Sequence, residues 1–338
     1  MTVTVDNIQV DILQPLTSLE CKKCSELPES MWQAQAIWFR DRLYMGGGMT
    51  SKSFRDDAKL RVYTPTADTW STMDTPTYHF ALVIYHSQLV LVGGIKYVGE
   101  RLGPLTNKLW SLSECGNWEE TLPPMITKRH SASAVSRGDH LLVAGGTTFD
   151  PLDVVEVFVY SDHRWVNTQP LPIPCQNMKS VVFNGYWYLM GGSRDQNVYF
   201  VSLDLLIASC QPLGETSYEW KKLPGVLHGQ FSPAVFGNRL TVVVGDCITQ
   251  PNSAVLAYSP SIESWVHVGN VPLIGDSSTC TIGLPTGELI VIGSDNHIIV
   301  NLKGMIVLVC QFFKSGRMDC IIVTSPYTYM YVYEMTPI

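Results

Sequence analysis

The chain has 338 residues, 46% of them hydrophobic and only 16% charged, which is enough apolar material to bury a sizeable core. Its formal net charge of −7 argues against a nucleic-acid-binding protein, because such proteins carry a basic face. The sequence contains neither an apolar run of about 18 residues nor a basic segment followed by an apolar one, so we expect no membrane span and no signal peptide. The nine cysteines, an odd number at irregular positions, favour a cytoplasmic setting over a disulfide framework.

Residues 1–12 are predicted to form a short lead, and after them one unit recurs along the chain. In this unit an apolar run of β type ends in a glycine pair. The pairs begin at positions 46, 93, 145 and 191, and weaker copies follow at Gly245 and Gly293, so that the spacing is 46 to 54 residues. A repeat of this length fits a unit of four strands.

Each glycine pair is preceded by a second apolar run and a tight turn, such as Asn184-Gly185, and two β runs joined in this way are typical of a hairpin. A third run follows the pair. In five of the six copies a tryptophan comes next: Trp70, Trp118, Trp165, Trp220 and Trp265. A fourth extended segment then leads to a Leu-Pro step, as at Leu223-Pro224.

Small four-stranded sheets cannot bury both faces alone, and stacking them radially leaves only short, protected edges. Glycine at the end of the second strand permits a close backbone approach, and tryptophan supplies a large apolar surface between sheets. We therefore predict an all-β fold, a six-bladed β-propeller with four antiparallel strands per blade over residues 13–302. Trp118, Trp165 and Trp220 are expected to be mostly buried between blades.

The glycine pair, a downstream aromatic residue (Tyr63, Tyr160 or Tyr258) and a tryptophan a few residues later together resemble the kelch repeat. The resemblance covers about residues 14–302, although the fifth and sixth copies depart from the glycine pair. Residues 128–131 (KRHS) also resemble the family's usual entry into the first strand. The resemblance implies a kelch-type propeller that binds other proteins, as in the substrate-recognition parts of ubiquitin-ligase adaptors.

The ring is predicted to close through its two chain ends. The segment CSELP (24–28) matches WKKLP (220–224) in kind and spacing, so residues 13–27 should form the fourth strand of the last blade and pair near residues 297–302. Cys21 and Cys24 form a CxxC pair, but no second pair lies at zinc spacing, and we expect no metal. Residues 303–338 form an apolar tail, expected to be either an extra strand pair or poorly ordered.

Ligand binding is expected on the face where the loops after the glycine pairs meet the loops between blades, because rigid sheets position such loops. The predicted ligand-binding residues are Trp32, Arg55, Tyr78, Arg101, Arg129, His130, Arg194 and His228. Arginine suits bidentate capture of carboxylates, so an acidic peptide is a reasonable ligand class. The alternative is that these arginines pair with nearby Asp and Glu residues. Arg129, beside the Pro123-Pro124 turn, is the first residue to test.

No phosphate-binding loop, dinucleotide fingerprint or nucleophile elbow is present in the sequence, so we predict no catalytic residue and no cofactor. The leading hypothesis is a non-enzymatic scaffold, monomeric as a propeller, that binds a protein or peptide and neither nucleic acid nor a membrane. The alternative is an enzyme on the same scaffold, similar to a copper radical oxidase or a sugar mutarotase, since fold alone does not fix function. Binding to cytoskeletal filaments is a third hypothesis, which no specific feature supports.

Overall fold

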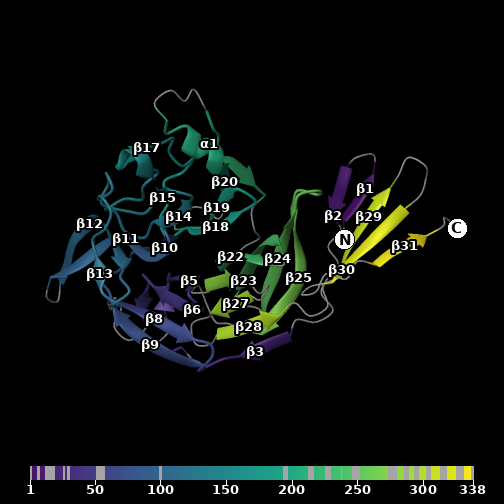
Figure 1. Ribbon diagram of the computed structural model, residues 1–338, viewed down its shortest axis with the longest axis horizontal. Helices are drawn as coiled ribbons and strands as arrows, with labels where there is room; N and C mark the ends of the chain where they lie inside the picture. Colours follow the sequence, from purple (N-terminus) through teal and green to yellow (C-terminus); the bar gives the residue numbers. More distant parts are fainter. Residues whose placement is uncertain are drawn as a thin grey trace.

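A computed structural model gives the fold of the chain (Figure 1). It describes residues 2–5, 8–11, 20–25, 27–28, 31–50, 58–98, 101–192, 197–211, 217–224, 230–236, 238–245, 252–272, 280–284, 289–292, 297–301, 306–312, 318–324 and 331–335. Among these residues no helix is both long and apolar enough to cross a membrane.

Six four-stranded antiparallel sheets account for most of the described chain. In spatial order their strands are β5 (Gln35–Phe39), β6 (Arg42–Gly46), β8 (Lys59–Thr64) and β9 (Thr69–Asp74); β10 (Ala81–Tyr85), β11 (Gln88–Val98), β12 (Arg101–Leu112) and β13 (Trp118–Glu119); β14 (Ser133–Arg137), β15 (His140–Ala144), β16 (Val155–Val159) and β17 (Arg164–Asn167); β18 (Lys179–Phe183), β19 (Tyr186–Met190), β20 (Val198–Ser202) and β21 (Lys221–Leu223); β22 (Gln230–Phe236), β23 (Arg239–Gly245), β24 (Asn252–Ser259) and β25 (Ser264–Pro272); and β26 (Cys280–Gly283), β27 (Leu289–Ile292), β28 (His297–Asn301) and β3 (Glu20–Lys23).

The first strands of these sheets pack around a common axis. Strands β5, β10, β14, β18, β22 and β26 each contact the next in this order, and β26 in turn contacts β5. Figure 1 shows the sheets radiating outward from this centre. Radial packing of small antiparallel sheets is the arrangement of a β-propeller, so the predicted all-β propeller with four-stranded blades is confirmed.

One blade is built from both ends of the repeat region. Strand β3 pairs antiparallel with β28, with Lys23 opposite Ile298 and Glu20 opposite Asn301. The pairing predicted between residues 13–27 and 297–302 is therefore confirmed where the structure describes it. Cys21 lies in β3 opposite Val300, and Cys24 is buried just beyond the strand.

A few elements lie outside the four-stranded sheets. They are the short pair β4 (Met31–Trp32) and β7 (Met49–Thr50), the 3-10 turn η1 (Tyr160–Asp162), the helix α1 (Leu203–Ala208), and a five-stranded sheet of β2 (Ile8–Asp11), β1 (Thr2–Val5), β29 (Ile306–Phe312), β30 (Met318–Thr324) and β31 (Tyr331–Met335). The last sheet joins the lead to the apolar tail through parallel pairing of β1 with β29. The tail thus contributes three strands rather than an isolated pair.

A hydrogen bond from a tryptophan recurs between neighbouring blades. The indole N–H groups of Trp70, Trp118, Trp165 and Trp265 donate to the main-chain oxygens of Ser25, Asp74, Pro123 and Pro224, at 2.8 to 3.2 Å. Each acceptor lies at or just beyond the last strand of the preceding blade. The repeated tryptophan therefore links each of these blades to the preceding blade by a hydrogen bond, and it also covers apolar surface between them. Trp165 is buried as predicted, whereas Trp118 and Trp220 are only half-buried.

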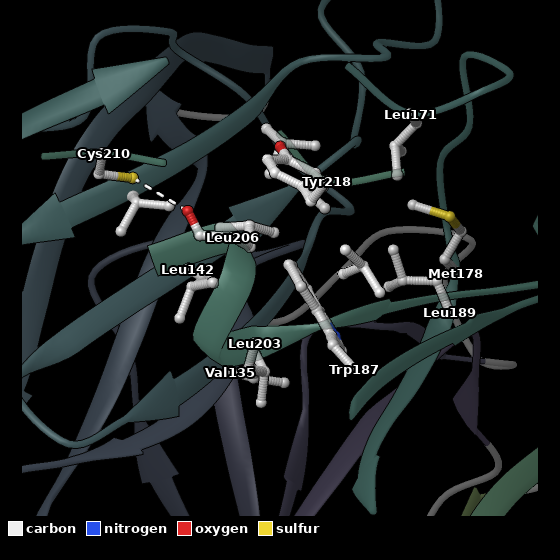
Figure 2. Close-up of a cluster of buried hydrophobic side chains, with 14 of the residues drawn as sticks. Val135, Leu142, Leu171, Met178, Trp187, Leu189, Leu203, Leu206, Cys210 and Tyr218 are labelled. Atoms are coloured by element: carbon white, nitrogen blue, oxygen red, sulfur yellow. Dashed lines mark hydrogen bonds between the residues drawn. The ribbon is translucent and has the colours of Figure 1, made fainter. Parts of the chain in front are cut away.

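The β18–β21 blade departs from this pattern and carries the unpredicted helix α1. The Trp220 N–H is buried and finds no partner among the described residues, and the Tyr218 hydroxyl instead donates to the Gln169 oxygen at 3.2 Å. Leu203 and Leu206 of α1 pack with Tyr218 and Trp187 in a core shared with the β14–β17 blade (Figure 2). Since the chain between β20 and β21 folds back as a helix, this blade buries more apolar surface at its outer side.

The glycine pairs are needed where two backbones approach closely. At Gly145, with φ +62°, an added Cβ would lie 2.5 Å from the Cys175 oxygen, and at Gly93, with φ +64°, it would lie 2.5 Å from the Arg129 oxygen. The Cys175 and Arg129 oxygens each belong to the loop that enters the next blade. The glycine pair therefore permits close contact between the end of one strand and the neighbouring interblade loop. A close backbone approach is the reason predicted from the sequence for these glycines.

Candidate functional site

The interblade loops and the segments after the glycine pairs meet on one face of the propeller, which we call the loop face. The Gly94 N–H donates to the Arg129 oxygen at 2.8 Å, and His130 and Thr147 exchange two main-chain hydrogen bonds of 3.1 and 2.9 Å. These bonds join the loop before β14 to the blade on either side. The loop face is therefore a rigid surface, as a preformed binding site requires.

Residues just before the first strands of four blades have left-handed backbone conformations on this face, around the central axis. Gln33, His79, Ser131 and Asn177 have φ values of 57°, 54°, 54° and 58°, and each lies two residues before the first strand of its blade. The Ser131 N–H donates to the His79 oxygen at 2.8 Å, and the Asn177 N–H donates to the Ser131 oxygen at 2.9 Å. Left-handed conformations are costly for residues other than glycine, and they concentrate at functional sites. The sequence pattern did not single out these positions, apart from their place before each first strand.

Arg129 does not face a ligand, and that part of the prediction is wrong. The side chains of Arg129 and Glu156 are both fully buried, and their guanidinium and carboxylate form an ion pair. Arg129 Nη1 also donates to the oxygens of Gly145 and Val154, at 2.9 and 2.8 Å. The physical reason is that the loop entering the β14–β17 blade folds inward over β16, which places the guanidinium beneath the surface. The alternative of an internal arginine–carboxylate pair holds at this position, with a partner distant in sequence.

Glu156 orders the same loop from the other side. Its carboxylate accepts hydrogen bonds from the main-chain N–H groups of Ile126 and Thr127, at 2.7 and 3.0 Å. Burial lowers the pKa of Arg129, and the charge and hydrogen bond of Glu156 oppose this shift. Arginine nevertheless remains protonated in proteins, so the pair is a buried salt bridge that fixes the loop over residues 125–130.

The other predicted residues fall into three groups. Tyr78 is buried, and its main chain exchanges hydrogen bonds with Ile95, which makes it part of the frame beneath the loop face. His130 is half-buried, with its Nδ1 2.9 Å from Ser131 Oγ and its ring 5.2 Å from that of His79. Trp32 lies in β4, and Arg101 lies at the start of β12 opposite Val98, but their side chains are outside the described residues. Arg55, Arg194 and His228 lie wholly outside the described residues.

The segment after Gly93 is not the variable loop that its sequence suggested. Strands β11 and β12 continue past the glycine pair as a long hairpin, with register shifts near Gly94 and Ile95. The rungs run out to Val98 opposite Arg101. The interruptions in register let the hairpin bend away from the blade, and so Arg101 lies at the hairpin tip.

An exposed aromatic residue, which the sequence pattern missed, stands on the loop face. Phe149 has 99% of its surface exposed, at the tip of the turn that follows Gly145-Gly146. Thr147 and Pro151 form a bridge across the base of this turn, and the Leu152 N–H donates to the Gly146 oxygen at 2.8 Å. Ile126, 54% exposed, lies in the loop that Glu156 holds. A large apolar side chain held out in water by a rigid turn is typical of an interaction surface.

The described residues contain no group of three or more His, Cys, Asp and Glu side chains placed to hold a metal ion. On the loop face the structure shows exposed apolar side chains, the half-buried imidazole of His130 beside Ser131, and the exposed charged residues Lys128 and Asp150.

The family model for the kelch motif matches residues 128–172, which include the Arg129 loop, the glycine pair at 145–146 and Trp165. This segment therefore carries a kelch motif, and the chain is similar to kelch-repeat proteins. Kelch-like protein 36 of Bos taurus is 29% identical over 154 residues, covering 42% of the chain and 24% of that protein. Beta-scruin of Limulus polyphemus is 27% identical over 191 residues, covering 50% of the chain and 20% of that protein.

A third similar kelch protein is kelch repeat and BTB domain-containing protein 1 of Vaccinia virus (strain Copenhagen), 24% identical over 212 residues, covering 61% of the chain and 36% of that protein. The chain thus spans about a fifth to a third of the length of these relatives. Among solved structures, that of YjhT superposes with a TM-score of 0.61 at 12% identity, covering 91% of this chain and 99% of that one. This likeness supports the propeller fold.

Proposed function

We propose that the chain is a closed six-bladed kelch propeller that binds a protein or peptide partner on its loop face and does no chemistry of its own. The six four-stranded sheets and the contact of β26 with β5 support the blade number. The kelch-repeat relatives support an interaction role, and one of them is named for a BTB domain beside its kelch repeat. The buried Cys210 and Cys280, which form no disulfide among the described residues, support a cytoplasmic setting.

The observation that carries the interaction surface is the full exposure of Phe149 on a rigid turn. An aromatic side chain loses little conformational entropy on binding when its backbone is already fixed, and it can bury a large apolar area in a partner's pocket. Ile126 belongs to the neighbouring ordered loop and extends the apolar contact. We therefore propose that the partner's footprint centres on Phe149 and Ile126 and includes His130, and we keep Trp32 and His228 as candidate contacts from the sequence.

The preference for an acidic partner now rests on Arg55, Arg101 and Arg194, because Arg129 is committed to Glu156. If these arginines contact the partner's carboxylates, affinity falls as salt screens the charges. Replacing all three with Ala should flatten that salt dependence. A partner bound by apolar contact alone should show little salt dependence in either protein.

The experiment that tests this function is affinity capture with the purified chain, followed by mass spectrometry of the bound proteins and a binding titration with the partner found. Phe149→Ala should weaken binding at least tenfold, as loss of a central aromatic residue does at protein interfaces. Ile262→Ala is the matched control, because Ile262 is 59% exposed in the turn between β24 and β25, away from the interblade loops. Equal loss in both variants, or a footprint on residues 306–335, would place the interaction elsewhere.

A role in substrate recognition for ubiquitin ligation extends this proposal. The relative named for its BTB domain combines such a domain with kelch repeats in one protein. A recognition propeller of this kind presents its bound partner to a second domain or chain. Reconstitution with a BTB-containing adaptor and measurement of partner ubiquitination would test the extension separately from binding itself.

A further inference from the structure

A cavity of about 310 Å³ lies on the axis of the propeller and belongs to no part of the partner surface described above. It is lined by residues of the first strands of all six sheets, among them Gln35, Ser136, Lys179 and Thr281. Each first strand is the edge strand of its sheet, so its unpaired main-chain groups face inward and need partners. The volume lies at the lower end of the range for small-molecule sites.

Neutral side chains satisfy part of this inner edge. Gln35 Oε1 accepts from the Leu82 N–H at 3.0 Å, and its Nε2 donates to the Ala132 oxygen at 2.8 Å. Ser136 Oγ donates to the Ile84 oxygen at 2.6 Å. These hydrogen bonds connect neighbouring first strands. They give Gln35 and Ser136, which line the cavity, a structural role.

Lys179 is different, because it brings a charge. Its Nζ donates to the Ala34 oxygen and lies 3.6 Å from Cys280 Sγ, across the axis. Cys280 Sγ itself donates to the Ala34 oxygen at 2.8 Å, no Asp or Glu lines the cavity, and Lys179 has no carboxylate partner among the described residues. The ammonium has three donors, of which the Ala34 oxygen and Cys280 Sγ use two, so one is left for a ligand. A confined cation without a counter-ion is poorly stabilised, so an anion entering the cavity would gain a charge-assisted hydrogen bond.

Thr281 supplies a second polar group without a role in the fold. The residue lines the same cavity and is only 8% exposed, and its Oγ1 has no hydrogen-bond partner among the described residues. Its main-chain N–H is already satisfied, since it donates to Ser232 Oγ at 2.9 Å. A buried hydroxyl without a partner is costly, and a ligand oxygen would satisfy it.

We propose that the axial cavity binds a small organic monocarboxylate, with the carboxylate paired to Lys179 and accepting a hydrogen bond from Thr281. A single positive charge balances a monoanion, whereas a phosphate dianion would remain half-compensated in a cavity without arginine. The site lies below the loop face, on residues that the protein-binding proposal does not use. Failure of the protein-binding proposal would therefore not affect this proposal, and the reverse also holds.

The test is a calorimetric titration of the full chain with propionate at constant ionic strength, with propionamide as a neutral isostere and inorganic phosphate as a competing anion. Wild type should bind propionate saturably, and propionamide and phosphate should bind at least tenfold more weakly. Lys179→Met should lose tenfold or more in affinity, Lys179→Arg should retain part of it, and Thr281→Val should weaken binding severalfold. Lys108→Met, at an exposed lysine paired with Glu120, is the matched control and should bind as wild type does.

Each other outcome overturns the proposal. No saturable propionate binding by wild type removes the site. Equal affinity for propionamide shows that charge is irrelevant, and tighter phosphate binding assigns the cavity to a different anion. Unchanged affinity in Lys179→Met places any carboxylate elsewhere. Should Lys179→Met prove unfolded by circular dichroism, the Thr281→Val and Lys179→Arg titrations decide the question, because wild-type affinity in both would reject the site.

Discussion

Arg129 and Glu156 form an ion pair, with both side chains fully buried, between the loop that enters the β14–β17 blade and that blade's third strand. The carboxylate also holds two main-chain N–H groups of the loop. Breaking a buried pair from one side leaves an uncompensated charge, which typically costs about 3–5 kcal/mol. The pair therefore controls whether the centre of the loop face is ordered.

We expect Glu156→Gln to lower the free energy of unfolding by about 3–5 kcal/mol, because it leaves Arg129 buried without an anion. Glu120→Gln is the control, since Glu120 pairs with Lys108 in an exposed bridge, which should contribute at most about 1 kcal/mol. Urea unfolding followed by fluorescence measures both. A cost below about 1 kcal/mol for Glu156→Gln would contradict the assigned role.

Gly145→Ala should be more destabilising than Gly138→Ala. Both glycines have positive φ, +62° and +56°, so both variants incur the left-handed penalty of about 1–2 kcal/mol. Nothing lies within 4 Å of a Cβ at Gly138, whereas at Gly145 the Cys175 oxygen lies 2.5 Å away. The clash should add about 1–3 kcal/mol at Gly145. Equal denaturation midpoints for the two variants would show that the close approach to the next loop is relaxed.

Truncation of Trp165 to Ala should cost about 3–5 kcal/mol, since it removes a buried indole and its hydrogen bond to the Pro123 oxygen. Trp118→Ala should cost less, because the Trp118 indole is only half-buried although it makes the equivalent bond to Asp74. Chemical denaturation of the two variants gives the comparison. Equal costs for the two variants would indicate that the shared indole hydrogen bond outweighs the difference in buried area.

Stability should fall in alkaline solution between pH 10 and pH 12. Burial raises the pKa of Tyr85 from 10.0 to about 12, with the charges of Asp139 and Tyr160 adding to the shift. Because the folded-state pKa lies above the unfolded one, the contribution of Tyr85 is complete below pH 10 and is lost as the pH rises through about 12. Ionisation also removes the hydroxyl proton that bonds to the Asp139 oxygen at 2.9 Å in the next blade.

The measurement is the urea midpoint as a function of pH in the wild type and in Tyr85→Phe. The variant should show a shallower decline in this window, although Tyr188, whose pKa burial also raises to about 12, maintains part of it. Tyr186→Phe, at an exposed tyrosine, serves as the comparison. A decline in Tyr85→Phe as steep as in the wild type would assign the alkaline sensitivity to other groups.

The propeller could be predicted from the sequence because its determinants repeat. The glycine pairs reflect a close approach that recurs at each blade, and the likeness of residues 24–28 to residues 220–224 predicted the pairing of β3 with β28. Helix α1 was missed, although Ser202 at its N-cap accepts from the Leu205 N–H and Leu203 and Leu206 share one face. Those local signals were present but were overridden by the expectation of strands.

The candidate site was harder to predict because its contacts are not repeated. The burial of Arg129 depends on Glu156, which lies on another strand and carries no local signal of pairing. The exposure of Phe149 depends on the bridge between Thr147 and Pro151, which lifts the turn away from the blade. From the sequence one would expect an arginine in a loop to be exposed and a phenylalanine in a β-rich chain to be buried, whereas the structure shows the reverse for Arg129 and Phe149. Only the tertiary fold decides between them.

The pairing of β3 with β28 also sets the order of events during synthesis. Glu20 leaves the ribosome well before its partner Asn301, which follows only after the other blades have been made. Until β28 is made, β3 is an unpaired strand and the sheet of β26, β27, β28 and β3 is incomplete. The contact between β26 and β5 therefore cannot close the ring, even if the earlier blades have folded. Domains of this size begin to fold as they emerge, and open edges attract chaperones or other chains. A product that terminates before β28 would therefore carry several finished blades and still be a target for quality control.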